Sequence, residues 1–88
     1  MNDVELYDKA LATYGIKQQL VVCMEECSEL AKECAKIYRA FESEDVFGLS
    51  NIAEEIADVQ IITGQIERFF LLKDAVKRNR KSKLKRLA

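Results

Sequence analysis

The 88-residue sequence contains no histidine, no proline and no tryptophan, and it has only three glycines. The scarcity of proline and glycine argues against a turn-rich β architecture, and a hydrophobic content of 49% favours long helices instead. The absence of histidine removes a ligand on which catalytic zinc sites and di-iron carboxylate bundles usually depend. We therefore expect an all-α chain whose chemistry rests on other side chains.

Long hydrophobic runs are also missing. No apolar stretch approaches the roughly 18 residues that a membrane-spanning helix needs. The first ten residues, "MNDVELYDKA", lack a basic start followed by an apolar run, which a secretory signal would show. We expect a cytoplasmic protein with no membrane partner.

Cysteine is present in an odd number, as Cys23, Cys27 and Cys34 on one helical stripe. A small secreted domain more often has an even set that forms disulfides, so reduced thiols fit better. We interpret them as small core hydrophobes, because free cysteine is among the most buried residue types. The alternative is a metal site, for which three thiols without histidine form an incomplete zinc set.

Charge is divided sharply along the chain. Residues 1–72 hold 6 basic and 14 acidic side chains, net −8, whereas residues 73–88 hold 8 basic and 1 acidic, net +7. The basic segment could contact nucleic acid, an anionic ligand or the acidic part of the chain itself. The charge pattern alone does not choose among these.

Apolar residues recur at helical spacing in four segments, at about 3–14, 17–41, 51–72 and 74–87. Asp3 is a candidate cap for the first helix and Gly15 its stop, and residues 42–48 interrupt the pattern. Asn51 with Glu54 resembles a capping box for the third helix, and Asp74 could cap the fourth. Gly64 carries a mild helix penalty unless another group packs close to it.

Carboxylates fall beside the apolar stripes of the two central helices. At about 100° per residue, Glu55 lies inside the stripe of the third helix and Asp58 lies one turn along on the same side. Glu26, Glu29 and Glu33 form a ridge that borders the stripe of the second helix. Two antiparallel helices would thus bring two carboxylate pairs, each with i, i+3 spacing, to one seam.

Four negative charges in a partly dry seam are costly unless they are protonated or matched by cations. The basic residues of these two helices are not aimed at that seam: Lys32, Lys36, Arg39 and Arg68. We therefore predict a divalent cation, and an all-oxygen ligand set favours Mg²⁺, with Mn²⁺ as the substitute. The alternative is a set of charges exposed around a helix bundle.

These motifs resemble a known family. "EECSE" (Glu25, Glu26, Glu29) followed after 25 residues by "EIAD" (Glu55, Asp58) is similar to the EExxE and ExxD pattern of MazG-like all-α nucleoside triphosphate pyrophosphohydrolases. The likeness extends to "YGIKQQLVVCMEECSELAKE", "NIAEEIADVQI" and the closing "KLKRL". The resemblance implies a four-helix bundle completed by dimerisation, as a homodimer or a tetramer of dimers.

The resemblance also implies an activity and its residues. Members hydrolyse a nucleoside triphosphate between the α and β phosphates with Mg²⁺, giving the monophosphate and pyrophosphate. On this reading the metal ligands are Glu26, Glu29, Glu55 and Asp58, and the catalytic candidates are Glu25 and Glu26. Substrate contacts would come from Lys83 and Arg86 on the outer phosphates, with Lys32 as a further cation, and from Tyr14 and Gln19 on the base.

A second hypothesis needs no catalysis. The chain would be a helical binding or regulatory module whose basic segment, "KRNRKSKLKR", contacts nucleic acid or a protein partner. Steeply salt-dependent binding would support it. The segment has no interleaved aromatic residues for stacking on single strands, so nucleic acid is the less favoured partner.

Overall fold

The computed structural model describes residues 1–44 and 48–88, and within them the chain forms four helices and no strand. The helices are α1 (Asp3–Tyr14), α2 (Ile16–Ser43), α3 (Ser50–Phe69) and α4 (Lys73–Leu87). The all-α prediction is confirmed. Part of the predicted interruption at 42–48 lies outside the described residues. No described helix is both long and apolar enough to cross a membrane.

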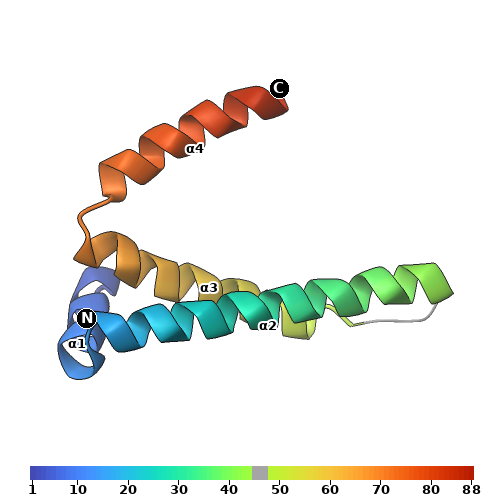
Figure 1. Ribbon diagram of the computed structural model, residues 1–88, viewed down its shortest axis with the longest axis horizontal. Coiled ribbons are helices and arrows are strands. Elements are labelled where there is room, and N and C mark those ends of the chain that lie inside the picture. The colour runs from blue at the N-terminus through green and yellow to red at the C-terminus, as the bar shows by residue number, and fades with distance from the viewer. Residues whose placement is uncertain (45–47) are drawn as a thin grey trace.

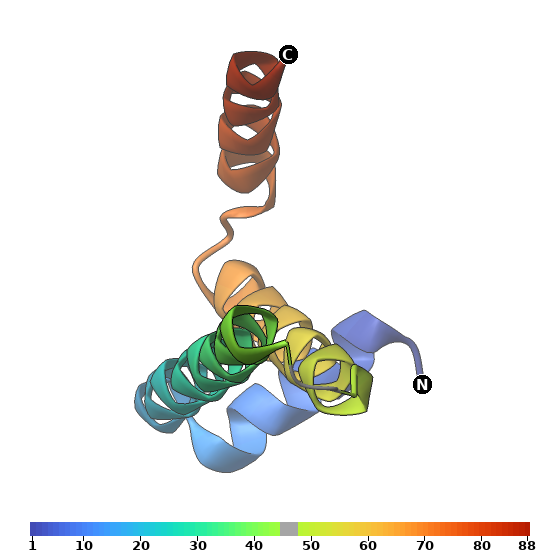
Figure 2. The same ribbon diagram turned by 90° about the vertical axis from the view of Figure 1, so that its right-hand side faces the viewer.

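Antiparallel α2 and α3 make the main contact of the fold, and α1 packs against both (Figure 1). In contrast, α4 contacts α3 alone among the described elements and projects away from the other three helices (Figure 2). The radius of gyration is 15.9 Å, whereas a compact domain of this length has about 12 Å. A single chain is therefore extended and does not close a four-helix bundle.

The starts of the helices differ in detail from the sequence expectations. Asn2, and not Asp3, caps α1, because its side-chain oxygen accepts a hydrogen bond from the backbone N–H of Glu5 at 2.8 Å. The predicted capping box at Asn51 is wrong, since α3 begins one residue earlier without a side-chain cap. Asp74 does not cap α4 either, and lies instead in its first turn.

Glycine at position 15 joins α1 to α2 as expected. Its backbone has φ 82, a conformation that costs other residues energy because of their Cβ atom. The Gly15 N–H donates to the carbonyl of Leu11 at 2.9 Å, and the Gly15 carbonyl accepts from the N–H of Gln19 at 3.1 Å. One residue thus ends the first helix and starts the second.

The turn between α3 and α4 sets the direction of α4. The third helix ends at Phe69, earlier than the predicted Leu72, because Leu71 adopts the left-handed conformation with φ 56. The N–H of Leu72 donates to the carbonyl of Glu67 at 2.9 Å and that of Leu71 to the carbonyl of Arg68 at 3.3 Å. This pair of bonds is a Schellman cap, with leucine where glycine is usual.

Among the residues that the structure describes, one apolar side chain is buried by the chain itself, that of Ile62 at 3% exposure. Large apolar side chains on α2 and α3 remain exposed, among them Met24, Tyr38, Phe41 and Phe69. The prediction that the cysteines are core residues is wrong for the single chain, because Cys27 and Cys34 are exposed and Cys23 is half-buried.

Two glutamines complete the small interior. Gln19 on α2 and Gln65 on α3 are 5% and 6% exposed, and the Gln19 Nε2 donates to the Gln65 Oε1 at 2.7 Å. A buried amide that keeps its partner costs little, whereas an orphaned amide loses its hydration without replacement. The pair therefore fixes the register of α2 against α3.

Replacing either glutamine by leucine is expected to lower the free energy of unfolding by about 1 to 3 kcal/mol, because the remaining amide is left unpaired. The Gln19→Leu/Gln65→Leu double variant should be close to the original protein in stability. Urea denaturation of the four chains measures this cycle. Additive losses in the double variant would contradict it.

Contacts between α1 and α3 hold the first helix in place. Arg68 donates to both carboxylate oxygens of Asp8, from Nε at 3.1 Å and from a terminal nitrogen at 3.2 Å. This bidentate pair holds the pKa of the Asp8 carboxyl below its ordinary value. Beside it, the Tyr7 ring lies so close to Gly64 that a Cβ atom there would be 2.8 Å from the ring. The expected close neighbour of Gly64 is therefore Tyr7.

Candidate metal site

Three of the four predicted metal ligands come together at the α2–α3 seam. Glu26 projects from α2, and Glu55 and Asp58 project from α3. One carboxylate oxygen of each lies within 4.8 Å of the others. Residues 55 and 58 share a helix face because they are three apart, and the antiparallel pairing brings residue 26 beside them. This group is called the carboxylate cluster below.

Glu55 is the least satisfied member of the cluster. Its side chain is half-buried, and its Oε2 atom is buried without a hydrogen-bond partner in the described structure. Burial raises the pKa of the Glu55 carboxyl above its ordinary value, as do the negative charges of Glu26, Asp58 and Glu29 and a hydrogen bond shared with Glu26. A buried oxygen with a free lone pair among other carboxylates is suited to a cation.

No basic side chain neutralises the cluster within residues 1–44 and 48–88. The two ion pairs in this part of the chain lie elsewhere, between Lys36 and Glu33 at 3.0 Å and between Arg68 and Asp8 at 3.1 Å. The expectation that these cations are not aimed at the seam is confirmed for Arg68, which pairs with Asp8 on α1, whereas Lys36 engages Glu33 of the acidic ridge. All donors of the cluster are carboxylate oxygens, and this ligand set suits Mg²⁺ and Mn²⁺ better than it suits zinc. The residues present therefore fit a hard divalent cation.

The raised pKa of Glu55 predicts how stability depends on pH without metal. Between the ordinary value of 4.5 and the higher folded value, the unfolded chain loses a proton that the folded chain keeps. The contribution of Glu55 to the free energy of unfolding must then fall as the pH rises through this window. In EDTA, the stability of the wild type relative to Glu55→Gln should decline from pH 4.5 upward.

Chemical denaturation at several pH values measures this difference, and Glu54→Gln provides the control, because Glu54 is exposed and outside the cluster. The gap between wild type and Glu54→Gln should stay flat over the same range. A constant gap between wild type and Glu55→Gln would show that the cluster does not repel charge at Glu55.

The other acidic candidates lie beside the cluster. Glu29 is exposed on α2, one turn after Glu26, and acts on Glu55 through its charge. Glu25 is exposed next to Glu26. Glu33 is engaged by Lys36. The structure therefore brings Glu26, Glu55 and Asp58 into one group, with Glu29 at its edge.

The candidates for base contacts occupy different surroundings. Tyr14 is exposed at the end of α1, and Lys32 is exposed on α2. Gln19, in contrast, is buried, and its amide nitrogen is used by Gln65. A contact between Gln19 and a nucleobase stays a prediction, and it would require this interior pair to open or to share the Gln19 amide.

Lys83 and Arg86 are not brought to the cluster of their own chain. Both are exposed on α4, which contacts α3 alone among the described helices (Figure 1). The end of α3 lies 14 residues after Glu55, or about 20 Å along the helix axis, and α4 diverges from there. The direction given by the Leu71 turn is the reason for this separation.

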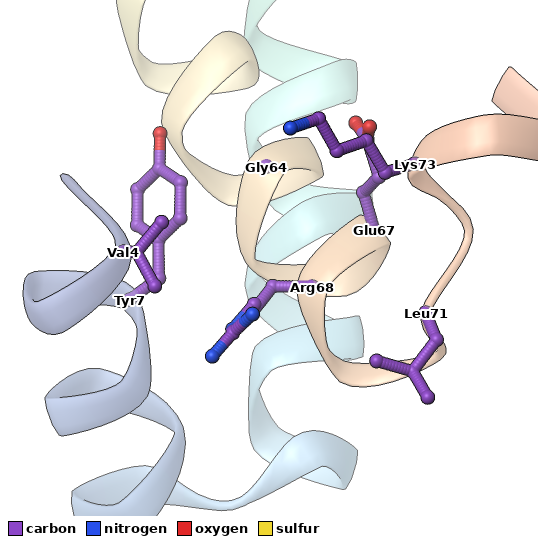
Figure 3. A pocket seen from close by; sticks show the side chains of 7 residues that line it. All are labelled: Val4, Tyr7, Gly64, Glu67, Arg68, Leu71 and Lys73. Carbon is purple, nitrogen blue, oxygen red and sulfur yellow. The ribbon is translucent and has the colours of Figure 1, made fainter. Parts of the chain in front are cut away.

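A pocket of about 380 Å³ lies between α1 and the end of α3 (Figure 3). Its walls include the Tyr7 ring, Arg68 and the exposed Leu71 side chain. None of the candidate metal, catalytic or substrate residues lines it. This pocket is separate from the carboxylate cluster.

The sequence did not identify Gln65 as the partner of Gln19. Nor did it predict the two contacts that hold α1 on α3, which are the Asp8–Arg68 pair and the packing of Tyr7 on Gly64. A signal for the glutamines existed, because Gln19 precedes Cys23, Glu26 and Leu30 on one helical ridge, as Gln65 follows Ile61 and Ile62. Polar residues on an apolar ridge need a partner, although spacing alone does not identify it.

No family model matches the chain, and no curated protein and no solved structure matches it.

Proposed function

We propose that this protein is a Mg²⁺-dependent nucleoside triphosphate pyrophosphohydrolase of the MazG-like kind. The observation that carries the proposal is the convergence of Glu26, Glu55 and Asp58 from two antiparallel helices, with a buried and unpartnered oxygen on Glu55. A cluster of this charge cannot receive a triphosphate directly, since both are anionic. It can receive one together with hard cations.

Each acidic residue has a role in this proposal. Glu26, Glu29, Glu55 and Asp58 supply oxygen ligands. When bound, Mg²⁺ polarises the phosphoryl oxygens and lowers the pKa of a coordinated water. Glu25, exposed beside the cluster, orients the attacking water. One of the two catalytic candidates, Glu25 or Glu26, accepts the proton of that water. The water oxygen bonds to phosphorus as the bridge between the α and β phosphates breaks, giving the monophosphate and pyrophosphate.

The proposal includes a second copy of the chain. Within residues 1–44 and 48–88, a single copy buries one apolar side chain, that of Ile62, and it leaves large apolar residues on α2 and α3 in contact with solvent. Small domains of this size often complete their core by oligomerisation. We therefore expect the active form to be a homodimer or a tetramer of dimers.

The direct test is pyrophosphate release from a panel of ribo- and deoxyribonucleoside triphosphates. Activity with Mg²⁺ or Mn²⁺, none in EDTA, and the monophosphate as the other product are expected. Release of inorganic phosphate alone would indicate a different bond and reject the proposed reaction. Calorimetry tests cation binding separately, first without nucleotide and then with it. If neither Mg²⁺ nor Mn²⁺ binds under either condition, the proposed metal site is rejected.

The alternative is a non-enzymatic binding module that uses α4. Its support is that α4 carries eight basic residues and that each of its residues except Ala75 is exposed. Nucleic acid is an unfavourable partner for α4, because the rest of the chain carries a net charge of −8 and α4 has no aromatic side chain. A protein partner for α4 remains.

A further inference from the structure

Helix α4 concentrates positive charge that no described acidic side chain of its own chain pairs with. Residues 73–88 hold eight basic side chains and one acidic side chain, net +7. None of the eight takes part in an ion pair among the residues that the structure describes. Seven pairs of these cations are spaced three or four residues apart on the helix, where like charges repel.

Packing within the chain does not support α4 either. The helix has 15 residues and none of them is buried. Isolated helices of this length are marginal in water even when their sequences favour helix. A helix that is self-repelling and has almost no tertiary contact is stabilised when an anionic surface covers it.

The α3–α4 turn prevents α4 from lying against its own acidic residues. The Leu72 N–H bonds to the Glu67 carbonyl at 2.9 Å, and the Val76 N–H bonds to the Leu72 carbonyl at 2.8 Å. Helix α4 therefore begins directly after the cap of α3, with no flexible linker between the two helices. The direction of α4 is set by these local bonds, and it leads away from α2 (Figure 2).

The same chain carries a complementary surface. Residues 25–33 of α2 and 54–58 of α3 hold seven acidic side chains and one basic side chain, net −6. The convergence of Glu26, Glu55 and Asp58 places these two segments side by side. We call this surface the acidic face, and it holds seven of the 14 acidic side chains of residues 1–72, of which Glu33 is paired with Lys36.

The docking side of α4 is defined by its apolar residues. Taking Val76 as zero, Leu87 lies at about 20° and Leu84 at about 80°, with Arg80 between them at about 40° and Lys77 at about 100°. A hollow of about 340 Å³ at the base of α4 continues this apolar side, and it is lined by Cys23, Thr63, Ile66, Glu67, Leu72 and Val76. A partner helix would find apolar contact at the base and cations along α4.

We propose that α4 of one copy docks through its Val76–Leu84–Leu87 side on the acidic face of a second copy of this chain. Charge complementarity selects this occupant, because +7 on the helix meets −6 on the face. Nucleic acid is the weaker occupant, since its phosphates would approach a molecule with a net charge of −8 outside α4. The proposal does not depend on the hydrolase activity.

Sedimentation equilibrium of the full chain at 0.15 M salt tests the docking side. Lys77→Glu/Arg80→Glu reverses two charges on that side, and it is expected to weaken self-association at least tenfold. Arg78→Glu/Lys85→Glu makes the same change in net charge on the opposite side, at about 200° and 180°. Because exposed charges are screened beyond about 8 Å at this salt, the control should change by less than threefold.

Cross-linking identifies the surface that α4 contacts. A short amine-to-thiol reagent is applied to a mixture of unlabelled and ¹⁵N-labelled chains, with Cys27 and Cys34 as the exposed thiols on α2. Peptides that join an α4 lysine to one of these thiols should carry mixed labels. Links within single chains only, or equal association of both charge variants, would overturn the proposal. So would oligonucleotide binding that is lost in Lys77→Glu/Arg80→Glu while its self-association is unchanged.

Discussion

Replacing Glu55 by glutamine is expected to reduce pyrophosphate release by at least about 100-fold. Changes to groups that only orient a metal ligand typically cost 10- to 100-fold, and Glu55 is placed to be a ligand itself. Its buried Oε2 atom lies in the carboxylate cluster without another partner. The glutamine is almost isosteric, so the helix content of the variant should be unchanged.

Two matched variants make the result specific. Glu54→Gln removes one negative charge from the adjacent, exposed position and should retain activity within about twofold, as surface changes usually do. Glu29→Gln, at the edge of the cluster, should reduce activity and raise the Mg²⁺ concentration needed for half-maximal rate. Unchanged activity in both Glu55→Gln and Glu29→Gln would remove the proposed site.

The stability of Glu55→Gln relative to the wild type should depend on whether metal is present. In EDTA the glutamine relieves repulsion by Glu26, Asp58 and Glu29, so Glu55→Gln should unfold at a higher temperature than the wild type at pH 7.5. A ligand that binds only the folded state adds stability as its concentration exceeds its Kd. Millimolar Mg²⁺ should therefore raise the Tm of the wild type and leave that of Glu55→Gln unchanged.

Local pattern was enough to predict the helices and the position of Glu55. Apolar spacing in α2 and α3 spans many turns, so errors of a few residues at the ends do not change which face is inside. Glu55 falls within that stripe by arithmetic alone, and the structure places its Oε2 atom in a buried position. The carboxylate cluster follows once two such helices are antiparallel.

Features set by a single hydrogen bond or by distant contacts could not be predicted. Asn2 and Asp3 are both good capping residues, and only the geometry of the first turn decides between them. Leu71 gives no sign in sequence of a left-handed conformation, which usually belongs to glycine. Since that residue directs α4 away from α2, the separation of Lys83 and Arg86 from the cluster was also beyond sequence reasoning.

The cysteines show how an apolar stripe can mislead. Cys27 and Cys34 have the spacing of core residues, yet a single chain leaves them exposed. The stripe on α2 is wider than the surface that α1 and α3 cover. Periodicity reports which side of a helix avoids water, and it does not report whether the covering surface comes from the same chain.

A larger side chain at Gly64 should disrupt the contact between α1 and α3. A Cβ atom there would lie 2.8 Å from Cε2 and 2.9 Å from Cζ and Oη of Tyr7. Overpacking typically costs 1 to 3 kcal/mol, and leucine adds three more carbons beyond the Cβ, so Gly64→Leu should lower the free energy of unfolding by about 3 kcal/mol. Gly48→Leu, at a glycine with open space around its Cβ position, is the control and should have little effect.

The close approach of Tyr7 also predicts a change of sign in the Gly64→Ala substitution. Alanine favours the helix interior over glycine by about 1 kcal/mol, but with Tyr7 present the clash should outweigh this gain and make the substitution destabilising. In a Tyr7→Ala background the clash is gone, and Gly64→Ala should stabilise by about 1 kcal/mol. Urea denaturation of the four chains measures the coupling, and the same sign in both backgrounds would mean that the ring moves aside freely. A ring that cannot move aside implies that α1 is held on α3 by shape, with the Asp8–Arg68 pair fixing its orientation.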